Sequence, residues 1–109
     1  MINSLSAIRE ILKQANQDAV LLTSIPNVIY ATGFAGFSES ERDGYVLVTG
    51  KNWYLLTNTL YETAVREQLD PAHILIYTKE NPLLYHLEAL CRQDNITVLG
   101  FEPENLSVA

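Results

Sequence analysis

Residues 44–57 read GYVLVTGKNWYLLT, and this stretch decides the fold. Two runs rich in β-branched and aromatic residues, Tyr45–Thr49 and Trp53–Thr57, flank the tripeptide Gly50-Lys51-Asn52. Such runs favour strands, and a short break containing glycine between two of them indicates a hairpin. The stretch therefore predicts an antiparallel pair of strands.

The residues before the hairpin predict one helix, one strand and one undecided segment. Apolar residues three and four apart predict an amphipathic helix over Leu5–Ala15. Ala19–Leu22 is wholly apolar, as expected for a strand that is covered on both faces. Val28–Phe34 has strand propensity, but it also fits a short helix that begins at Asn27 and stops at Gly33.

The residues after the hairpin alternate between helical and strand patterns. Thr59 and Glu62 have the spacing of a capping box, and Asn81-Pro82 is a typical helix start. The second of these helices has an apolar face of Leu83, Leu84, Leu87, Leu90 and Cys91. In order, we expect a helix over Leu60–Leu69, a strand over His73–Tyr77, a helix from Asn81 to Asp94 and a strand over Ile96–Phe101.

This order of elements predicts the fold class. Hairpin strands run antiparallel, whereas strands that are joined by a crossover helix run parallel. We therefore expect an α/β domain of three layers, α/β/α, around a mixed, mostly parallel five-stranded sheet with one antiparallel hairpin. The 109 residues form one domain, 1–109. Because Glu102–Ala109 looks like the approach to another helix, we expect the chain to be cut from a longer protein before its last helix.

Composition excludes several classes of protein. Hydrophobic residues make up 48% of the chain, which is typical of a folded core. A net charge of −6 without clustered cations argues against nucleic-acid binding. No apolar run approaches the roughly 18 residues that a membrane span needs, so we expect no membrane partner. The single cysteine and the absence of a secretory pattern favour the cytoplasm.

Residues capable of catalysis are few and scattered. His73, His86 and Cys91 lie in apolar segments without the spacing of a metal site or a nucleophile, so we interpret them as structural. The carboxylate pairs Glu39/Glu41 and Glu102/Glu104 are interpreted as solvated surface. We therefore expect a domain that is not an enzyme by itself and that contains neither a metal nor a cofactor.

The polar loop of residues 35–43 is the best candidate for a contact surface. It carries an aromatic ring, Phe37, two acids, Glu39 and Glu41, and a base, Arg42, between two regular elements. Loops that are held at both ends concentrate binding residues. The alternative is a loop that is merely solvated. An arginine binds carboxylates well, and an aromatic ring packs well on apolar groups.

The motif NVIYATGF at residues 27–34, together with the strands around it and Tyr61, resembles the creatinase/prolidase N-terminal domain. The resemblance covers essentially the whole chain and implies a ribonuclease-H-like layout. It also favours the short helix over the strand for residues 27–33. The motif positions that it implies to be structural are Asn27, Tyr30, Thr32, Gly33, Phe34 and Tyr61.

The resemblance also implies a function. Such a domain is the non-catalytic front part of an Xaa-Pro aminopeptidase or Xaa-Pro dipeptidase (prolidase), a hydrolase that cleaves the bond before proline. The catalytic domain that follows would hold two divalent metal ions, Mn²⁺, Co²⁺ or Zn²⁺. The implied partners are that C-terminal catalytic domain, a second subunit in a homodimer, and a proline-containing peptide. The front domain would build the dimer and cover the active-site entrance, where Phe37, Glu39 and Arg42 are the candidate contacts.

At two positions the chain departs from the family pattern, and two other functions remain as alternatives to the peptidase front domain. The family commonly has an acid where this chain has Asn58, and an arginine where it has Leu60. The front domain of a non-peptidase relative, creatine amidinohydrolase or a peptidase-like module that binds protein, is the alternative. A nuclease is disfavoured, because the strand ends carry threonines instead of the acids that hold metal.

Overall fold

The structure is a computed structural model that describes residues 4–37 and 43–102. None of its described helices is long and apolar enough to cross a membrane. A short 3₁₀ turn, Pro71–His73, stands before the fourth strand. The other elements are α1 (Ser4–Gln14), β1 (Ala19–Leu22), α2 (Ile25–Thr32), β2 (Gly44–Thr49), β3 (Trp53–Thr57), α3 (Glu62–Gln68), β4 (Ile74–Ile76), α4 (Leu83–Gln93) and β5 (Leu99–Phe101).

The five strands form one mixed sheet in the order β4-β3-β2-β1-β5. The predicted hairpin is confirmed, since β2 and β3 pair antiparallel with Leu47 opposite Tyr54. β2 also pairs antiparallel with β1, a neighbour that the sequence did not identify. β4 is parallel to β3, and β5 is parallel to β1. All strands except β2 therefore run in one direction, as expected for a mostly parallel sheet.

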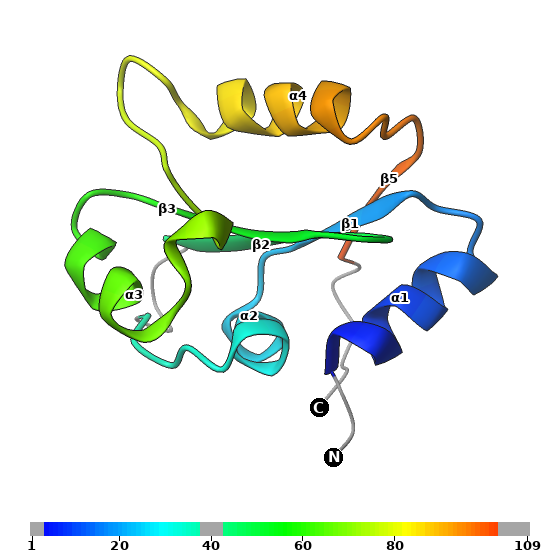
Figure 1. The fold of residues 1–109 in the computed structure, drawn as a ribbon, viewed down its shortest axis with the longest axis horizontal. Helices are drawn as coiled ribbons and strands as arrows, with labels where there is room; N and C mark the ends of the chain where they lie inside the picture. Colours follow the sequence, from blue (N-terminus) through cyan, green and yellow to red (C-terminus); the bar gives the residue numbers. More distant parts are fainter. Residues whose placement is uncertain (1–3, 38–42, 103–109) are drawn as a thin grey trace.

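Helices cover both faces of the sheet, so the predicted three layers are confirmed. Figure 1 shows α4 on one side and α1, α2 and α3 on the other. The side chains of each strand alternate between the two faces. On β2, Val46 and Val48 join the core under α1, α2 and α3, whereas Leu47 joins the core under α4. The apolar run of β1 is buried in the same way on both sides.

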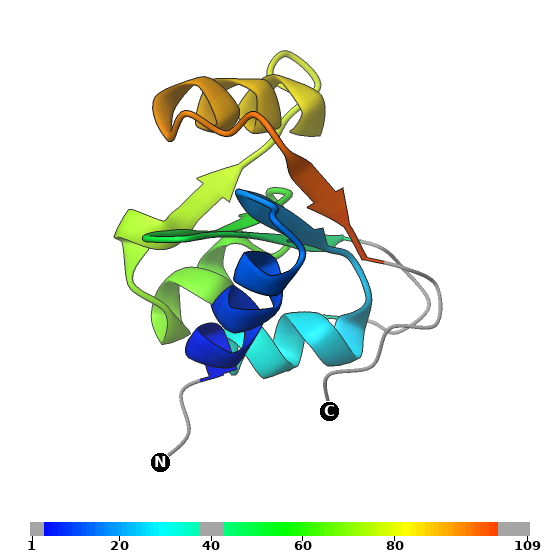
Figure 2. The same ribbon diagram turned by 90° about the vertical axis from the view of Figure 1, so that its right-hand side faces the viewer.

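The connections explain why the helices separate in this way. From β3 the chain crosses through α3 to β4, one step outward in the sheet. From β4 it crosses through α4 back over the whole sheet to β5 at the opposite edge. Crossovers between parallel strands are right-handed, so two crossovers in opposite directions place their helices on opposite faces. Figure 2 shows the result, with β5 beside β1 and α4 alone above the sheet.

Residues 25–32 form the short helix α2, which settles the choice that the sequence left open. Gly33 ends the helix in the left-handed region with φ of 79°, where glycine is favoured, as expected. The start differs from the expectation, because the cap is Ser24 and not Asn27. The Ser24 hydroxyl accepts a bond from the Asn27 backbone N–H, and Pro26 occupies the first turn, where no amide hydrogen is needed.

The expected caps of α3 and α4 are wrong. The Asn58 side chain accepts a bond from the Leu60 amide and forms a turn, so α3 begins only at Glu62 without a side-chain cap from Thr59. α4 begins at Leu83 with Pro82 and not Asn81 as its cap, because residues 78–81 close a turn of their own. Leu84 of the expected apolar face of α4 is 64% exposed.

The expected outer strands are too long. Thr97 and Val98 donate their backbone amides to the Asp18 carboxylate, so β5 begins only at Leu99. His73 belongs to the 3₁₀ turn that Asp70 caps, so β4 begins at Ile74. In both places a polar contact takes the backbone donors that a longer strand would use.

We predict that Leu21→Ala lowers the free energy of unfolding by about 2–5 kcal/mol, the usual cost of a truncated core leucine. Leu21 is buried against the α4 layer from the middle of the sheet. The matched control is Leu84→Ala on the exposed side of α4, where we expect a change within about 0.5 kcal/mol. Urea denaturation followed by circular dichroism measures both, and equal effects would contradict the assignment of the core.

Candidate functional site

The carboxyl ends of four strands meet at one edge of the sheet. β1, β3, β4 and β5 run in the same direction, so the residues that follow them lie at this end. In open α/β sheets, binding sites form at this carboxyl edge. The polar residues that it gathers are Thr23 and Ser24 after β1, Asn58 after β3, Tyr77 after β4 and Glu102 after β5.

Glu102 is the most heavily bonded side chain at this edge. One carboxylate oxygen accepts the backbone amides of Thr23 at 2.6 Å and Ser24 at 2.8 Å, and the Thr23 hydroxyl at 3.2 Å. The other accepts the Ser24 hydroxyl at 2.5 Å and the side-chain amide of Asn27. Asn27 is 1% exposed, so its amide needs this partner. The carboxylate also lies at the positive end of α2.

These bonds change the ionisation of Glu102. Partial burial by itself raises a carboxyl pKa, but the bonds from Ser24, Thr23 and Asn27 outweigh it and hold the pKa of Glu102 below its usual 4.5. Glu102 is therefore ionised at neutral pH and bonded inside the fold. The prediction that it belongs to a solvated pair with Glu104 is wrong for Glu102, and Glu104 lies outside the described residues.

A second polar group connects the start of β2 to the ends of β3 and β4. The Thr57 hydroxyl donates to the Asp43 backbone carbonyl at 2.6 Å, and the Asn58 amide donates to the Asp43 carboxylate at 3.1 Å. Burial raises the pKa of Tyr77, and the nearby Tyr45 and Asp43 raise it further. Asn58 acts here as a donor, which the acid that the resemblance implies at this position could not do when ionised. Leu60, where the resemblance implies an arginine, is 76% exposed.

Phe37 lies in the core instead of on the surface of its loop. Its ring is 6% exposed and packs between Phe34, at 4.9 Å between centroids, and Tyr61, at 4.8 Å. It links the end of α2 to the start of α3, and in this structure the ring is not available to a substrate. The other two candidates in the loop, Glu39 and Arg42, lie outside the described residues.

The motif positions named by the resemblance have structural contacts. Thr32 donates its hydroxyl to the Val28 carbonyl and accepts the Phe34 amide, which fixes the chain around Gly33. Phe34 is fully buried, and Tyr30 and Tyr61 pack against the same core.

The remaining reactive residues do not gather into a catalytic group. His73 stacks on Trp53 at 4.1 Å, with Nδ1 2.8 Å from the Trp53 carbonyl oxygen, so Nδ1 carries the proton. His86 lies against Tyr85, and its buried Nε2 has no bonding partner within residues 4–37 and 43–102. Burial raises the pKa of the Cys91 thiol, and Asp94 adds to this, which disfavours the reactive thiolate. Across those same residues, no three His, Cys, Asp or Glu side chains form a group that could hold a metal ion.

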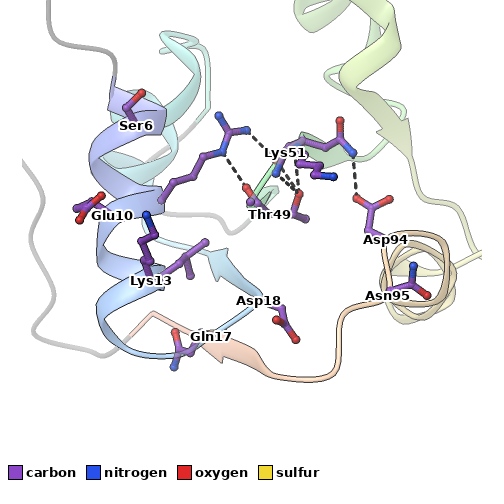
Figure 3. A pocket seen from close by; sticks show the side chains of 13 residues that line it. Ser6, Glu10, Lys13, Gln17, Asp18, Thr49, Lys51, Asp94 and Asn95 are labelled. Carbon is purple, nitrogen blue, oxygen red and sulfur yellow. Dashed lines mark hydrogen bonds between the residues drawn. The ribbon is translucent and has the colours of Figure 1, made fainter.

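A polar pocket of about 770 Å³ lies at the opposite end of the sheet. Figure 3 shows Glu10 and Lys13 of α1 on one side, and Asp94 and Asn95 at the end of α4 on the other. Arg9 donates to the backbone carbonyls of Thr49 at 2.8 Å and Asn52 at 3.2 Å, so it fastens α1 to the hairpin turn. Asp94 accepts bonds from the Tyr54 hydroxyl and the Asn52 amide. The polar groups of this pocket therefore hold elements together.

Sequence reasoning missed Glu102, Asp18 and Arg9. Each bonds to groups at least 40 positions away along the chain, so no local spacing identifies the partner. Thr23-Ser24 before a helix start does indicate free backbone donors that need an acceptor. That signal predicts an anion at the start of α2, but it does not say which one.

Comparison with known families and structures shows what this chain is similar to. The model of the creatinase/prolidase N-terminal domain matches residues 5–109. A search of curated proteins gave no match. An Xaa-Pro aminopeptidase from Streptococcus pyogenes is 26% identical with a TM-score of 0.74, over 95% of this chain and 74% of that one.

Two further solved structures share the fold. An Xaa-Pro dipeptidase from Bacillus anthracis is 22% identical with a TM-score of 0.77, over 96% of this chain but only 28% of that one. The N-terminal domain of a cytoplasmic peptidase from Mycobacterium tuberculosis is 23% identical with a TM-score of 0.73, over 96% of this chain and 76% of that one. This chain therefore spans about a quarter of the dipeptidase.

We predict that Gly44→Ala destabilises the domain through Phe37. A Cβ atom at Gly44 would come within 2.5 Å of the Phe37 ring, which the core holds on both sides. The expected cost is about 1–3 kcal/mol, as for other overpacked sites. The control is Gly50→Ala in the hairpin turn, where a Cβ meets no atom within 4 Å. Thermal melts measure both variants, and an unchanged Gly44→Ala melt would show that the Phe37 ring is not fixed.

Proposed function

We propose, because the chain belongs to the creatinase/prolidase N-terminal domain family, that it is the non-catalytic front domain of a cytoplasmic Xaa-Pro aminopeptidase or Xaa-Pro dipeptidase. The observation that carries this proposal is the family match over residues 5–109. The Xaa-Pro peptidases among the solved structures of the same fold support it. In the proposed parent, a further domain hydrolyses the bond before proline.

The proposed metals belong to that further domain. The residues of this chain that the structure describes form no group that fits a metal ion, so they do not fit a site for two ions. We assign the pair of divalent ions, Mn²⁺, Co²⁺ or Zn²⁺, to the C-terminal catalytic domain, where they would activate water. This chain would contribute shape and contacts: one surface for the homodimer, and one that covers the active-site entrance.

The carboxyl edge of the sheet is the part of this domain that we assign to the entrance. Phe37 is fixed in the core, and Asp43 is fixed by Thr57 and Asn58, so both ends of the intervening loop are anchored. The residues between these anchors include Glu39 and Arg42. An arginine can bind a peptide carboxylate through two parallel hydrogen bonds. We therefore keep Glu39 and Arg42 as the proposed contacts, and we assign Phe37 the role of an anchor.

The full-length protein that contains this chain is expected to hydrolyse an Xaa-Pro dipeptide in the presence of Mn²⁺, Co²⁺ or Zn²⁺. Residues 1–109 alone are expected to give no hydrolysis above a control that contains only the metal. Release of proline, measured by chromatography, reports both reactions. Hydrolysis by residues 1–109 alone would contradict the proposal. A full-length protein that cleaves creatine instead, or that only binds protein, would establish the non-peptidase alternative.

Arg42→Ala in the full-length protein is expected to lower kcat/KM for a dipeptide about tenfold or more, equivalent to about 1.4 kcal/mol. The physical reason is the loss of a paired contact with the substrate carboxylate. Lys51→Ala is the control, since it removes a cation from the hairpin turn at the opposite end of the sheet. Equal kinetics of both variants and the wild type would leave the loop as solvated surface.

A further inference from the structure

Apolar packing holds β5 only weakly. Among the described strands it pairs with β1 alone, at the edge of the sheet. Its middle residue is Gly100, and the side-chain amide of Gln17 lies where a Cβ would be. Its last residue, Phe101, is 67% exposed. A strand of three residues that ends the described sheet and buries little side chain needs another source of stability.

That source is one carboxylate at each end of the strand pair. At the start, Asp18 before β1 accepts the amides of Thr97 and Val98 and the Thr97 hydroxyl, each at 2.9 Å. At the end, Glu102 after β5 accepts the amides of Thr23 and Ser24. The first carboxylate comes from the β1 side and the second from the β5 side. Each therefore binds the other strand across the pair.

We propose that Asp18 and Glu102 form an acid-sensitive clamp that releases β5 from β1 while the rest of the sheet stays folded. An ionised carboxylate only accepts hydrogen bonds, and protonation turns one of its oxygens into a donor. The amides and hydroxyls around both carboxylates then lose an acceptor. β1, β2 and β3 keep their own pairings and both apolar cores, so the release stays local.

The groups around each carboxylate set the direction of the pH effect. Glu102 faces the uncharged side chains of Thr23, Ser24 and Asn27. Asp18 borders the polar pocket, whose charged residues are Arg9, Glu10, Lys13, Lys51 and Asp94. The bonds from Thr97 and Val98 hold the pKa of Asp18 below its usual 3.8, as those of Glu102 hold its own below 4.5.

The lowered pKa values in the folded state determine the direction in which pH acts on the clamp. The clamp is fully present above the ordinary pKa values of 4.5 and 3.8, and it is lost as the pH falls through the lower values of the folded state. Asp18 is exposed and Glu102 is partly buried, so salt screens the first more than the second. Release uncovers the edge of β1, whose four residues are buried, and leaves it open to another strand.

Hydrogen exchange measured by NMR on the 109-residue chain tests the clamp. In Glu102→Gln at pH 7, the protection factors of amides in 99–102 are expected to fall at least tenfold, while those in 46–48 and 54–56 stay within twofold. Asp18→Asn, at the exposed end, is the second variant and is expected to show the same local loss to a smaller degree. Glu88→Gln on the exposed side of α4 is the control and is expected to change neither set.

Acid titration of the wild type supplies the independent readout. As the pH drops below 4.5, the amides in 99–102 are expected to lose protection before those in 54–56. The NMR chemical shift of the Glu102 carboxyl carbon should show a pKa below 4.5. In Glu102→Gln this acid-dependent loss in 99–102 should shrink. Equal loss of protection in all strands, or unchanged protection in 99–102 in both variants, would overturn the clamp.

Discussion

The sheet of this chain is apolar on both faces, and the other features of the fold follow from the need to cover them. β1 has four buried residues in a row, and β2 alternates Val46 and Val48 with Leu47 between two separate cores. Apolar surface of this extent must be removed from water on each side. The crossover through α4 covers one face, and α1, α2 and α3 cover the other. The short connections that remain emerge at the two ends of the sheet, where the contacts of Asp18, Glu102 and Arg9 are found.

The elements that depend on burial could be predicted from the sequence. The boundaries of β1 and β3 agree with the apolar runs because β1 is buried along its whole length and β3 is buried from Tyr54 to Thr57. Gly33 ends α2 as expected, because the backbone there is left-handed and glycine is favoured in that conformation. The errors fall where a polar side chain takes over a backbone donor, as Asp18 does before β5 and Asn58 does before α3. Such contacts depend on which segments meet in space, and local propensity does not contain that information.

The loop of residues 35–43 shows the same contrast between what composition predicts and what contacts in space decide. Its composition predicted a contact surface, and residue type alone made Phe37 a candidate contact like its charged neighbours Glu39 and Arg42. The ring is in fact buried, and the glycines on either side leave room for aromatic rings: a Cβ at Gly36 would meet Phe34, and one at Gly44 would meet Phe37. An aromatic residue in a glycine-flanked segment is thus as compatible with a core anchor as with a binding residue. The packing of Phe37 on Phe34 and on Tyr61, which precedes α3, decides between the two.

Several ionised side chains in the described part of the chain hold secondary-structure elements together. Catalytic acids and bases keep a lone pair or a proton directed at a substrate, and their pKa values move toward the working pH. Here Asp18 and Glu102 have pKa values that move away from neutrality, and their oxygens are taken by backbone and hydroxyl donors. Arg9 and Asp94 likewise join α1 and α4 to the hairpin. The ionised groups named here therefore fasten strands and helices of the domain to one another, as expected for the non-catalytic front domain proposed above.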